Sequence, residues 1–160
     1  MDHTEIRYGV ASAEDIAGMS GIEMLQAMVE GRLPAPAISK TLGFLLVELG
    51  EGSAVFEGAT GPHLLNPLGI VHGGFALTLI DSAAGCAVHT TLPAGVSYTT
   101  IETKVNFTGA IRADRGTIRA EGRVVAAGKQ IATAEARVLA ADGKILAHGT
   151  STLMILRPRG

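Results

Sequence analysis

The chain has 160 residues, of which 47% are hydrophobic and 18% charged, and its formal net charge is -2. This balance is typical of one globular domain with a full core, and it excludes a disordered chain. Because acidic and basic residues are interspersed, the sequence has no basic cluster of the kind that binds nucleic acid or an anionic membrane.

Cysteine usage and the N-terminus indicate where the protein works. Cys86 is the only cysteine, so neither an internal disulfide nor a thiolate metal cluster can form within the chain. The start, MDHTEIRYGV, lacks the basic and then apolar layout of a signal peptide. The longest apolar run, 75–88, is too short for a membrane span and contains Asp81. We therefore expect a cytoplasmic protein with no nucleic acid or membrane partner.

The first part of the chain predicts one short helix. Residues 1 to about 19 show no clear period and are interpreted as an arm or loop. Ser20 and Glu23 have the spacing of a capping box, and apolar residues recur at helical spacing up to Gly31, which ends the helix. The segment LPAPA then favours extended backbone, and ISKTLGF predicts one further helical turn.

The remaining sequence predicts six strands and one long helix. The stretch FLLVELGEGSAVFEGAT predicts two strands joined by a turn at 50–52. After a break at NPLG, the run that follows His72 is the longest helix candidate and ends between His89 and Pro93. Four β-like segments follow: SYTTIETKVNF, GTIRAEGRVVAA, QIATAEARVLA and KILAHGTSTLMIL. A six-stranded antiparallel sheet must bury one face, so we predict an α+β domain whose sheet wraps round this long central helix.

The motif VHGGF at the start of the long helix has two interpretations. The first amide N–H groups of a helix have no partners within the helix, and the helix dipole favours negative charge there. The N–H of Gly73 can therefore stabilise a developing oxyanion. Alternatively, Gly73 and Gly74 only permit close packing against the sheet.

Asp81 raises the same choice in the middle of the apolar run. An ionised carboxylate among apolar residues is costly to bury unless it is hydrogen-bonded or paired. It is either part of an exposed stripe of the helix or a functional group that an apolar wall poises as a base. Gly73 and Asp81 are eight residues apart, which is about 12 Å along a helix axis. If both act on one carbonyl, the second must come from another copy of the chain, which predicts a homodimer with composite sites.

The motif N-P-L-G-I-V-H-G-G-x6-D, formed by Asn66, His72, Gly73, Gly74 and Asp81, resembles the PaaI-like branch of the hotdog-fold acyl-CoA thioesterases. TIETKVNFTGAI resembles the strand that follows the helix in this family. The resemblance implies a hotdog thioesterase domain over 40–160, preceded by an N-terminal helical extension over 1–39. It also implies a connection with phenylacetate degradation and no cofactor other than the coenzyme A of the substrate. The histidines have no metal-site spacing with carboxylates, so we expect no metal. We expect a dimer of dimers, and dimer against tetramer stays open because sheets of this fold pair in more than one way.

The resemblance also implies a role for each matching residue. Gly73 corresponds to the amide donor to the thioester carbonyl, and Asn66 to the side chain near that carbonyl or near the attacking water. His72 corresponds to a histidine that orients the loop. Asp81 corresponds to the carboxylate that activates water or attacks directly, with Thr100, rather than Thr99, as its partner on the next strand. Gly74, Phe75 and Leu65 are the expected substrate-binding residues.

Two other functions remain open at this point. A hydratase or dehydratase on the same fold would pair His72 with Asp81, again from two chains. A non-catalytic acyl-CoA-binding module would not need Asp81. The acyl group, aryl or medium-chain, is not readable from the sequence. The phosphates of coenzyme A could meet basic residues that otherwise belong to a solvated sheet edge: Arg112, Arg115, Arg123, Lys129 and Arg137.

Overall fold

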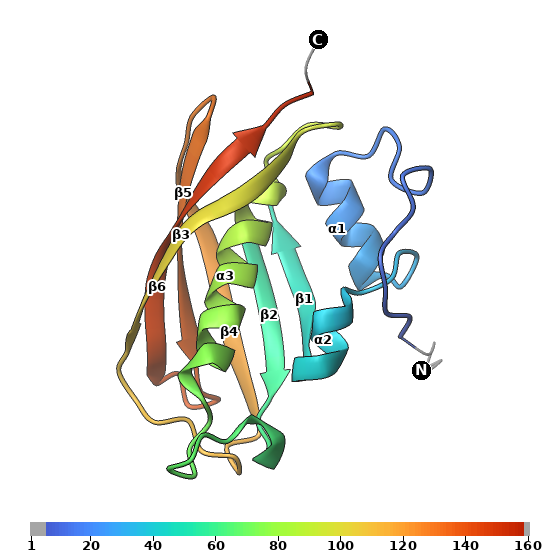
Figure 1. Cartoon of the computed structure of the whole chain (residues 1–160). Coiled ribbons are helices and arrows are strands. Elements are labelled where there is room, and N and C mark those ends of the chain that lie inside the picture. The colour runs from blue at the N-terminus through green and yellow to red at the C-terminus, as the bar shows by residue number, and fades with distance from the viewer. Residues whose placement is uncertain (1–5, 159–160) are drawn as a thin grey trace.

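The computed structural model describes residues 6–158 and begins with the predicted helical extension (Figure 1). Helix α1 spans Gly21–Val29, and its start is stabilised by the Glu23 carboxylate, which accepts a hydrogen bond of 2.8 Å from the Ser20 backbone N–H. Helix α2 spans Ala37–Leu42 and ends at Gly43, whose φ of 72° is left-handed. Both predicted helical segments are confirmed. Of the predicted arm, residues 1–5 lie outside the described residues.

Six strands form one antiparallel sheet, as predicted. They are β1 (Phe44–Gly50), β2 (Ser53–Ala59), β3 (Ser97–Phe107), β4 (Thr117–Ala127), β5 (Ile131–Leu139) and β6 (Ile145–Leu156). The strand order is β1-β2-β4-β5-β6-β3, so β3 lies at one edge although it precedes β4 in the chain. The long helix α3 (Gly73–His89) separates β2 from β3 in sequence and fills the concave side of the sheet (Figure 1).

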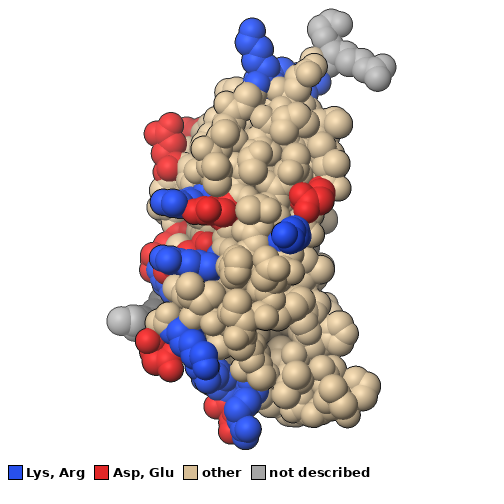
Figure 2. Space-filling model, turned by 90° about the vertical axis from the view of Figure 1, so that its left-hand side faces the viewer, with Lys and Arg blue, Asp and Glu red and all other residues tan. Residues whose placement is uncertain are grey.

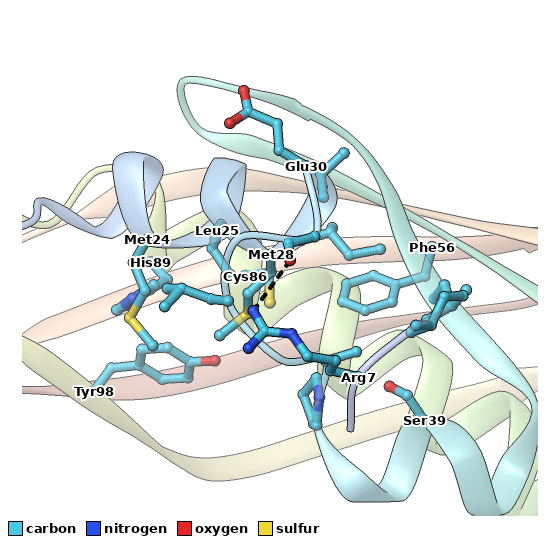
Figure 3. A pocket seen from close by; sticks show the side chains of 18 residues that line it. Arg7, Met24, Leu25, Met28, Glu30, Ser39, Phe56, Cys86, His89 and Tyr98 are labelled. Carbon is cyan, nitrogen blue, oxygen red and sulfur yellow. Dashed lines mark hydrogen bonds between the residues drawn. The ribbon is translucent and has the colours of Figure 1, made fainter. Parts of the chain in front are cut away.

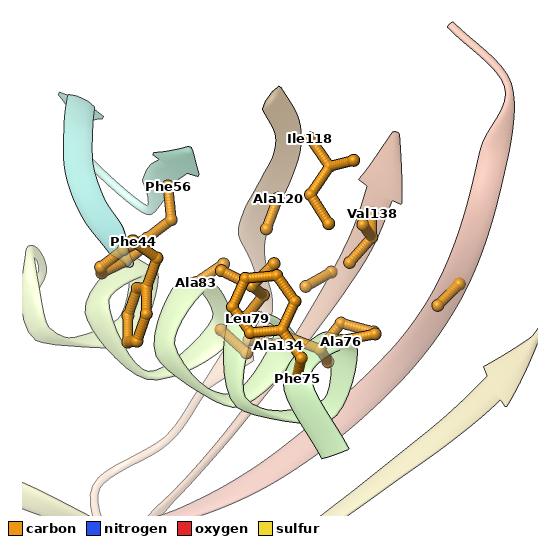
Figure 4. Packing of buried hydrophobic residues seen from close by; sticks show 14 of the residues in the cluster. Phe44, Phe56, Phe75, Ala76, Leu79, Ala83, Ile118, Ala120, Ala134 and Val138 are labelled. Atoms are coloured by element: carbon orange, nitrogen blue, oxygen red, sulfur yellow. The ribbon is translucent and has the colours of Figure 1, made fainter. Parts of the chain in front are cut away.

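The core forms where α3 meets the inner face of the sheet. Strands β2 and β5 alternate buried and less buried residues, and the buried phase faces the helix. From α3, Phe75, Leu79 and Ala83 point into this layer, opposite Phe44, Phe56 and small residues of β4 and β5 (Figure 4). A Cβ built on Gly122 of β4 would be 2.3 Å from the Ala83 carbonyl oxygen, so the helix backbone touches the strand there.

The outer face of the sheet is polar. Arg119 of β4 contacts three carboxylates, those of Glu48, Glu57 and Glu121, and Glu121 also pairs with Arg137 of β5. Figure 2 shows basic and acidic side chains next to one another on this side of the molecule. Cross-strand pairs of this kind stabilise a solvated sheet face.

The extension is attached to the domain on the other side. Helix α1 packs against β1 and α3, and the chain before it runs beside Ala35 through a parallel bridge at Tyr8. The expected division of the chain after residue 39 stays a prediction. None of the helices within 6–158 is long and apolar enough to cross a membrane.

Candidate active site

The predicted site residues come from three neighbouring elements: the loop before α3, α3 itself, and β3. The loop is held by Asn66, whose side-chain oxygen accepts from the N–H groups of Leu68 at 2.9 Å and Ile70 at 3.3 Å. This use of the oxygen turns the amide NH₂ of Asn66 away from the loop backbone. The side chain is half-buried, so its NH₂ can reach a ligand beside the loop.

His72 is the N-cap of α3. Its Nδ1 accepts a hydrogen bond of 2.8 Å from the Gly74 N–H, which replaces the Ser, Thr or Asp usually found there. Because Nδ1 accepts, the proton of a neutral His72 ring is on Nε2. The backbone N–H of His72 donates to the Leu64 carbonyl at 2.7 Å, which ties the helix start to the preceding turn.

Gly73 is the first residue of α3, and within residues 6–158 its N–H has no hydrogen-bond acceptor. A Cβ at Gly73 would lie 2.9 Å from Cζ of Phe107, a residue at the end of β3 that is 58% exposed. The glycine therefore allows β3 to approach the helix start closely. An open N–H at a helix N-terminus is suited to an oxygen that gains negative charge.

Asp81 lies in the middle of α3, and side chains of β3 hold its carboxylate in place. Its Oδ1 accepts hydrogen bonds of 3.0 Å from both Thr100 and Thr103. The carboxylate is half-buried, and among the described residues its Oδ2 accepts no hydrogen bond. This arrangement fixes one oxygen and leaves the other for water or substrate. Thr99 is exposed and makes no such contact.

A β-bulge explains why two threonines three residues apart face the same carboxylate. Strict alternation would put Thr100 and Thr103 on opposite faces of β3. The pairing of β3 with β6 slips between Thr100 and Glu102, so Ile101 is an extra residue and the phase of the strand changes. Tyr98 and Thr100 before the bulge, and Thr103 and Val105 after it, accordingly share the half-buried face.

Thr103 is in turn supported by Ser151 of β6. Their hydroxyl oxygens are 2.9 Å apart, and Ser151 also lies 3.1 Å from the Glu102 carbonyl oxygen. A hydroxyl has one proton, so when Thr103 donates to Asp81 its contact with Ser151 uses the Ser151 proton, which the Glu102 carbonyl oxygen also accepts. Sequence reasoning missed both residues. Ser151 could have been found from the sequence, because it is a polar residue on the inward-facing phase of β6, the phase that also contains Leu153. Thr103 could not, because only the bulge turns it toward the same face as Thr100.

Gly73 and Asp81 belong to the same uninterrupted helix, so their separation of eight residues amounts to about 12 Å along its axis. One chain does not bring the Gly73 N–H and the Asp81 carboxylate to one reacting carbon. Within the chain the structure instead forms two separate groups of site residues: Asp81 with Thr100 and Thr103, and the α3 start with the loop that contains Asn66 and His72.

The expected substrate-binding residues have different surroundings. Gly74 donates its N–H to the His72 cap, and Leu65 is 38% exposed on the loop before α3. Phe75, by contrast, is a core residue that is 3% exposed, and a Cβ at Gly58 would lie 2.9 Å from its ring. The prediction that Phe75 contacts substrate therefore has little support from its position.

Basic residues considered for coenzyme A are mostly occupied. Arg112 pairs with Asp114, Arg115 with Asp142, Arg123 with Glu135, and Arg137 with Glu121, at distances from 2.7 to 3.6 Å. These pairs favour the interpretation of a solvated sheet edge.

Comparison with known proteins shows the family to which the chain is similar. Residues 68–147 match the family model of the thioesterase superfamily. A phenylacetic acid degradation-related protein of Ralstonia eutropha JMP134 has a similar structure, with a TM-score of 0.74 and 28% identity over 81% of this chain and 98% of that one. A conserved protein of Pseudomonas aeruginosa has a TM-score of 0.70 and 34% identity over 75% and 94%. The PaaI protein of E. coli, from the phenylacetic acid degradation operon, has a TM-score of 0.68 and 25% identity over 78% and 86%. No curated protein sequence matches the chain.

Proposed function

The chain belongs to the thioesterase superfamily, as a PaaI-like protein with the hotdog fold, and we propose that it hydrolyses acyl-CoA thioesters at sites shared by two protomers. The substrate is a coenzyme A thioester with an aryl or medium-chain acyl group, and the products are the free acid and coenzyme A. Coenzyme A enters as part of the substrate, and the scheme uses no other cofactor and no metal.

The observation that carries this proposal is the pair of hydrogen bonds from Thr100 and Thr103 to Oδ1 of Asp81. Two donors on one oxygen keep the carboxylate in one orientation and direct Oδ2 away from them. A base must be within hydrogen-bond reach of the proton that it takes, and a fixed carboxylate meets this requirement better than a mobile one. A module that only binds acyl-CoA has no need for such an arrangement.

In the proposed reaction, Asp81 takes a proton from water, and the water oxygen attacks the thioester carbonyl carbon. The carbonyl oxygen becomes an oxyanion that accepts a hydrogen bond from the Gly73 N–H of the second protomer. The oxyanion re-forms the carbonyl, the C–S bond breaks, and the thiolate of coenzyme A leaves with the proton that Asp81 took from water, which returns Asp81 to its carboxylate form. Removing a single oxyanion donor typically costs about 100- to 1,000-fold in rate. In this scheme the amide NH₂ of Asn66 assists beside the same carbonyl.

His72 supports hydrolysis over the hydratase alternative. A hydratase requires the histidine and the carboxylate to handle protons at neighbouring carbons, with the ring nitrogen facing the substrate. Here Nδ1 accepts from the Gly74 N–H and the proton of the neutral ring is on Nε2, so the ring has no free nitrogen to take a proton from substrate, and His72 orients the helix start in this scheme. The exposed Nε2 is left for solvent or for the coenzyme A part of the substrate.

Strand β3 supplies a route to the shared site. It is an edge strand of eleven residues with Ile101 and Phe107 more than half exposed, and long unpaired edges of this kind favour pairing with another strand. Two copies of β3 paired antiparallel about a two-fold axis would continue the sheet. Phe107 lies against Gly73, and Thr100 donates to Asp81. A register that sets Phe107 of one copy opposite Thr100 of the other therefore brings each Gly73 toward the Asp81 of the other protomer. A further pairing of such dimers gives the proposed tetramer.

Mixing inactive variants tests the shared site. Asp81→Ala and Gly73→Pro each remove one half of the site, and proline is tolerated at the first position of a helix. Random reassociation of the two variants restores about one quarter of the native sites, because half of the dimers contain one intact site of two. Gly73→Ala is the control, since it adds the same Cβ against Phe107 but keeps the N–H. Activity in a monomer, or no recovery on mixing folded variants, would contradict the shared site.

The chemical role of Asp81 needs a separate experiment. A carboxylate that attacks directly forms an anhydride, whereas a general base leaves the water oxygen in the acid product. A single turnover in ¹⁸O-labelled water distinguishes them. Label only in the released acid supports the general base, and label in Asp81 supports direct attack.

A further inference from the structure

A cavity of about 690 Å³ lies between α1, β1, the second half of α3 and the start of β3 (Figure 3). Its volume is within the range of about 300–1,000 Å³ that is common for small-molecule sites. Helix α1 contributes Met24, Leu25 and Met28, and Cys86 and Tyr98 form the opposite wall. The two groups of site residues described above, around Asp81 and around the start of α3, do not line this cavity.

The cavity begins one helical turn beyond Asp81. Tyr98 precedes Thr100 by two residues on the same face of β3, and Thr100 donates to Asp81. A Cβ at Gly85, four residues after Asp81, would lie 2.6 Å from the Tyr98 hydroxyl, so this glycine makes room for the ring. Burial raises the pKa of the Cys86 thiol to about 12, and the nearby negative charge of Asp81 contributes to that rise. Tyr98 and Cys86 therefore lie near the carboxylate, which is not itself among the residues that line the cavity.

The lining suits an uncharged, flexible group. Figure 3 shows the Tyr98 hydroxyl directed toward the middle of the cavity, where Cys86 and Met28 lie. Both Cys86 and Tyr98 stay neutral, because burial raises the pKa of the thiol and of the phenol. Methionine side chains adapt to the shape of a ligand, and two of them come from α1.

The two charged lining residues already have partners. Arg7 donates to the carbonyl oxygens of Gly31 and Arg32, and Glu30 pairs with Arg32. Both side chains are thus held at the wall by other protein groups, and α1 and α3 offer apolar contact to an acyl chain. The lining residues of the cavity reach from Tyr98 and Cys86 on one side to Phe56 and Ser39 on the other, which leaves room for a chain of several carbon atoms.

On the basis of the proposed function, we propose that this cavity receives a linear, uncharged, medium-length acyl chain, and that α1 of the N-terminal extension is the wall that limits its length. The thioester carbon is then at Asp81, and the chain runs past Tyr98 and Cys86 toward α1. The extension, which precedes the hotdog elements, acts in this way as the determinant of acyl-chain specificity.

The test changes the α1 wall and measures hydrolysis of butyryl-, octanoyl-, dodecanoyl- and phenylacetyl-CoA. Met28→Trp narrows the cavity and is expected to lower the octanoyl-to-butyryl ratio of kcat/KM about tenfold, as when two methylene groups lose their apolar contacts. Met28→Ala widens the cavity and is expected to shift the preference toward dodecanoyl-CoA. Gln26→Trp, on the exposed face of α1, is the matched control and should leave the ratios unchanged.

A binding measurement separates this inference from the proposed function. In an Asp81→Asn background, calorimetry should show that octanoyl-CoA binds and that Met28→Trp weakens its binding about tenfold. If folded Met28 variants change neither the chain-length ratios nor this affinity, or if phenylacetyl-CoA is preferred and insensitive to Met28, the acyl assignment is wrong. If the native protein binds octanoyl-CoA in the α1-dependent way but hydrolyses no thioester, the proposed function fails and the cavity assignment stands.

Discussion

Replacing Gly122 by alanine tests the contact that sets the distance between α3 and the sheet. The new Cβ would be 2.3 Å from the Ala83 carbonyl oxygen and 2.9 Å from the Ala84 nitrogen. Favourable contact between such atoms needs about 3.5 Å, so α3 must move away from β4 by about 1 Å. Because backbone atoms are on the helix side of the contact, no rotation of a side chain can relieve it.

The cost of this movement follows from the packing round the contact. Overpacking a well-filled core costs about 1–3 kcal/mol, and here the whole helix rather than one side chain must shift. We expect a loss near the upper end, about 3 kcal/mol, which corresponds to a fall in Tm of about 6–12 °C for a chain of this size. Asp81 precedes Ala83 by two residues, so the shift also moves the carboxylate relative to Thr100 and Thr103 and disturbs its two hydrogen bonds. Turnover should fall even at temperatures where the variant is folded.

Thermal unfolding followed by circular dichroism, together with acyl-CoA hydrolysis, checks both expectations. Gly109→Ala is the control, because a Cβ there meets its nearest neighbour at 3.4 Å, an ordinary contact. If Gly122→Ala unfolds within about 2 °C of the native protein and keeps native turnover, α3 is not seated on β4 as described.

Two further predictions concern Asp81 and His89. Thr103→Val removes one of the two donors to Asp81 and should lower kcat by about 10- to 100-fold, since a hydrogen bond to a charged group is worth about 1.5–3 kcal/mol. Thr99→Val, on the outer face, is the control and should leave kcat unchanged. Equal kcat values for the two variants would show that Thr103 does not position the base. Burial lowers the pKa of His89 from 6.5, so its neutral form stabilises the fold above pH 6.5, and this stability is lost as the pH falls through the lower pKa of the folded state. Chemical denaturation between pH 7 and 5 should therefore show that the free energy of unfolding falls more steeply as the pH is lowered for the native protein than for His89→Gln. One proton changes this free energy by at most about 1.4 kcal/mol per pH unit. Identical pH dependences for the two proteins would refute this.

Local patterns in the sequence were sufficient to predict the elements and their arrangement. The helical spacing around Leu25, the turn at 50–52, the apolar run after His72 and the four β-like segments all correspond to elements of the structure. Hydrophobic period reports which face of an element is buried, and one long apolar helix with six strands has few ways to bury itself. Alternation along β3 allowed only one of Thr99 and Thr100 to face Asp81, the family resemblance favoured Thr100, and the structure has Thr100 in contact with Asp81.

Other features depend on pairing and packing, which no local pattern contains. The bulge at Ile101 exists only in the register of β3 against β6, and it brings Thr103 to Asp81 and Ser151 to Thr103. The core position of Phe75 depends on the space that Gly58 leaves on β2. The cavity exists only because α1, remote in sequence from Cys86 and Tyr98, packs across β1. A residue's period fixes the side of its own element that it faces, but the groups it meets there are decided by how separate elements register and pack.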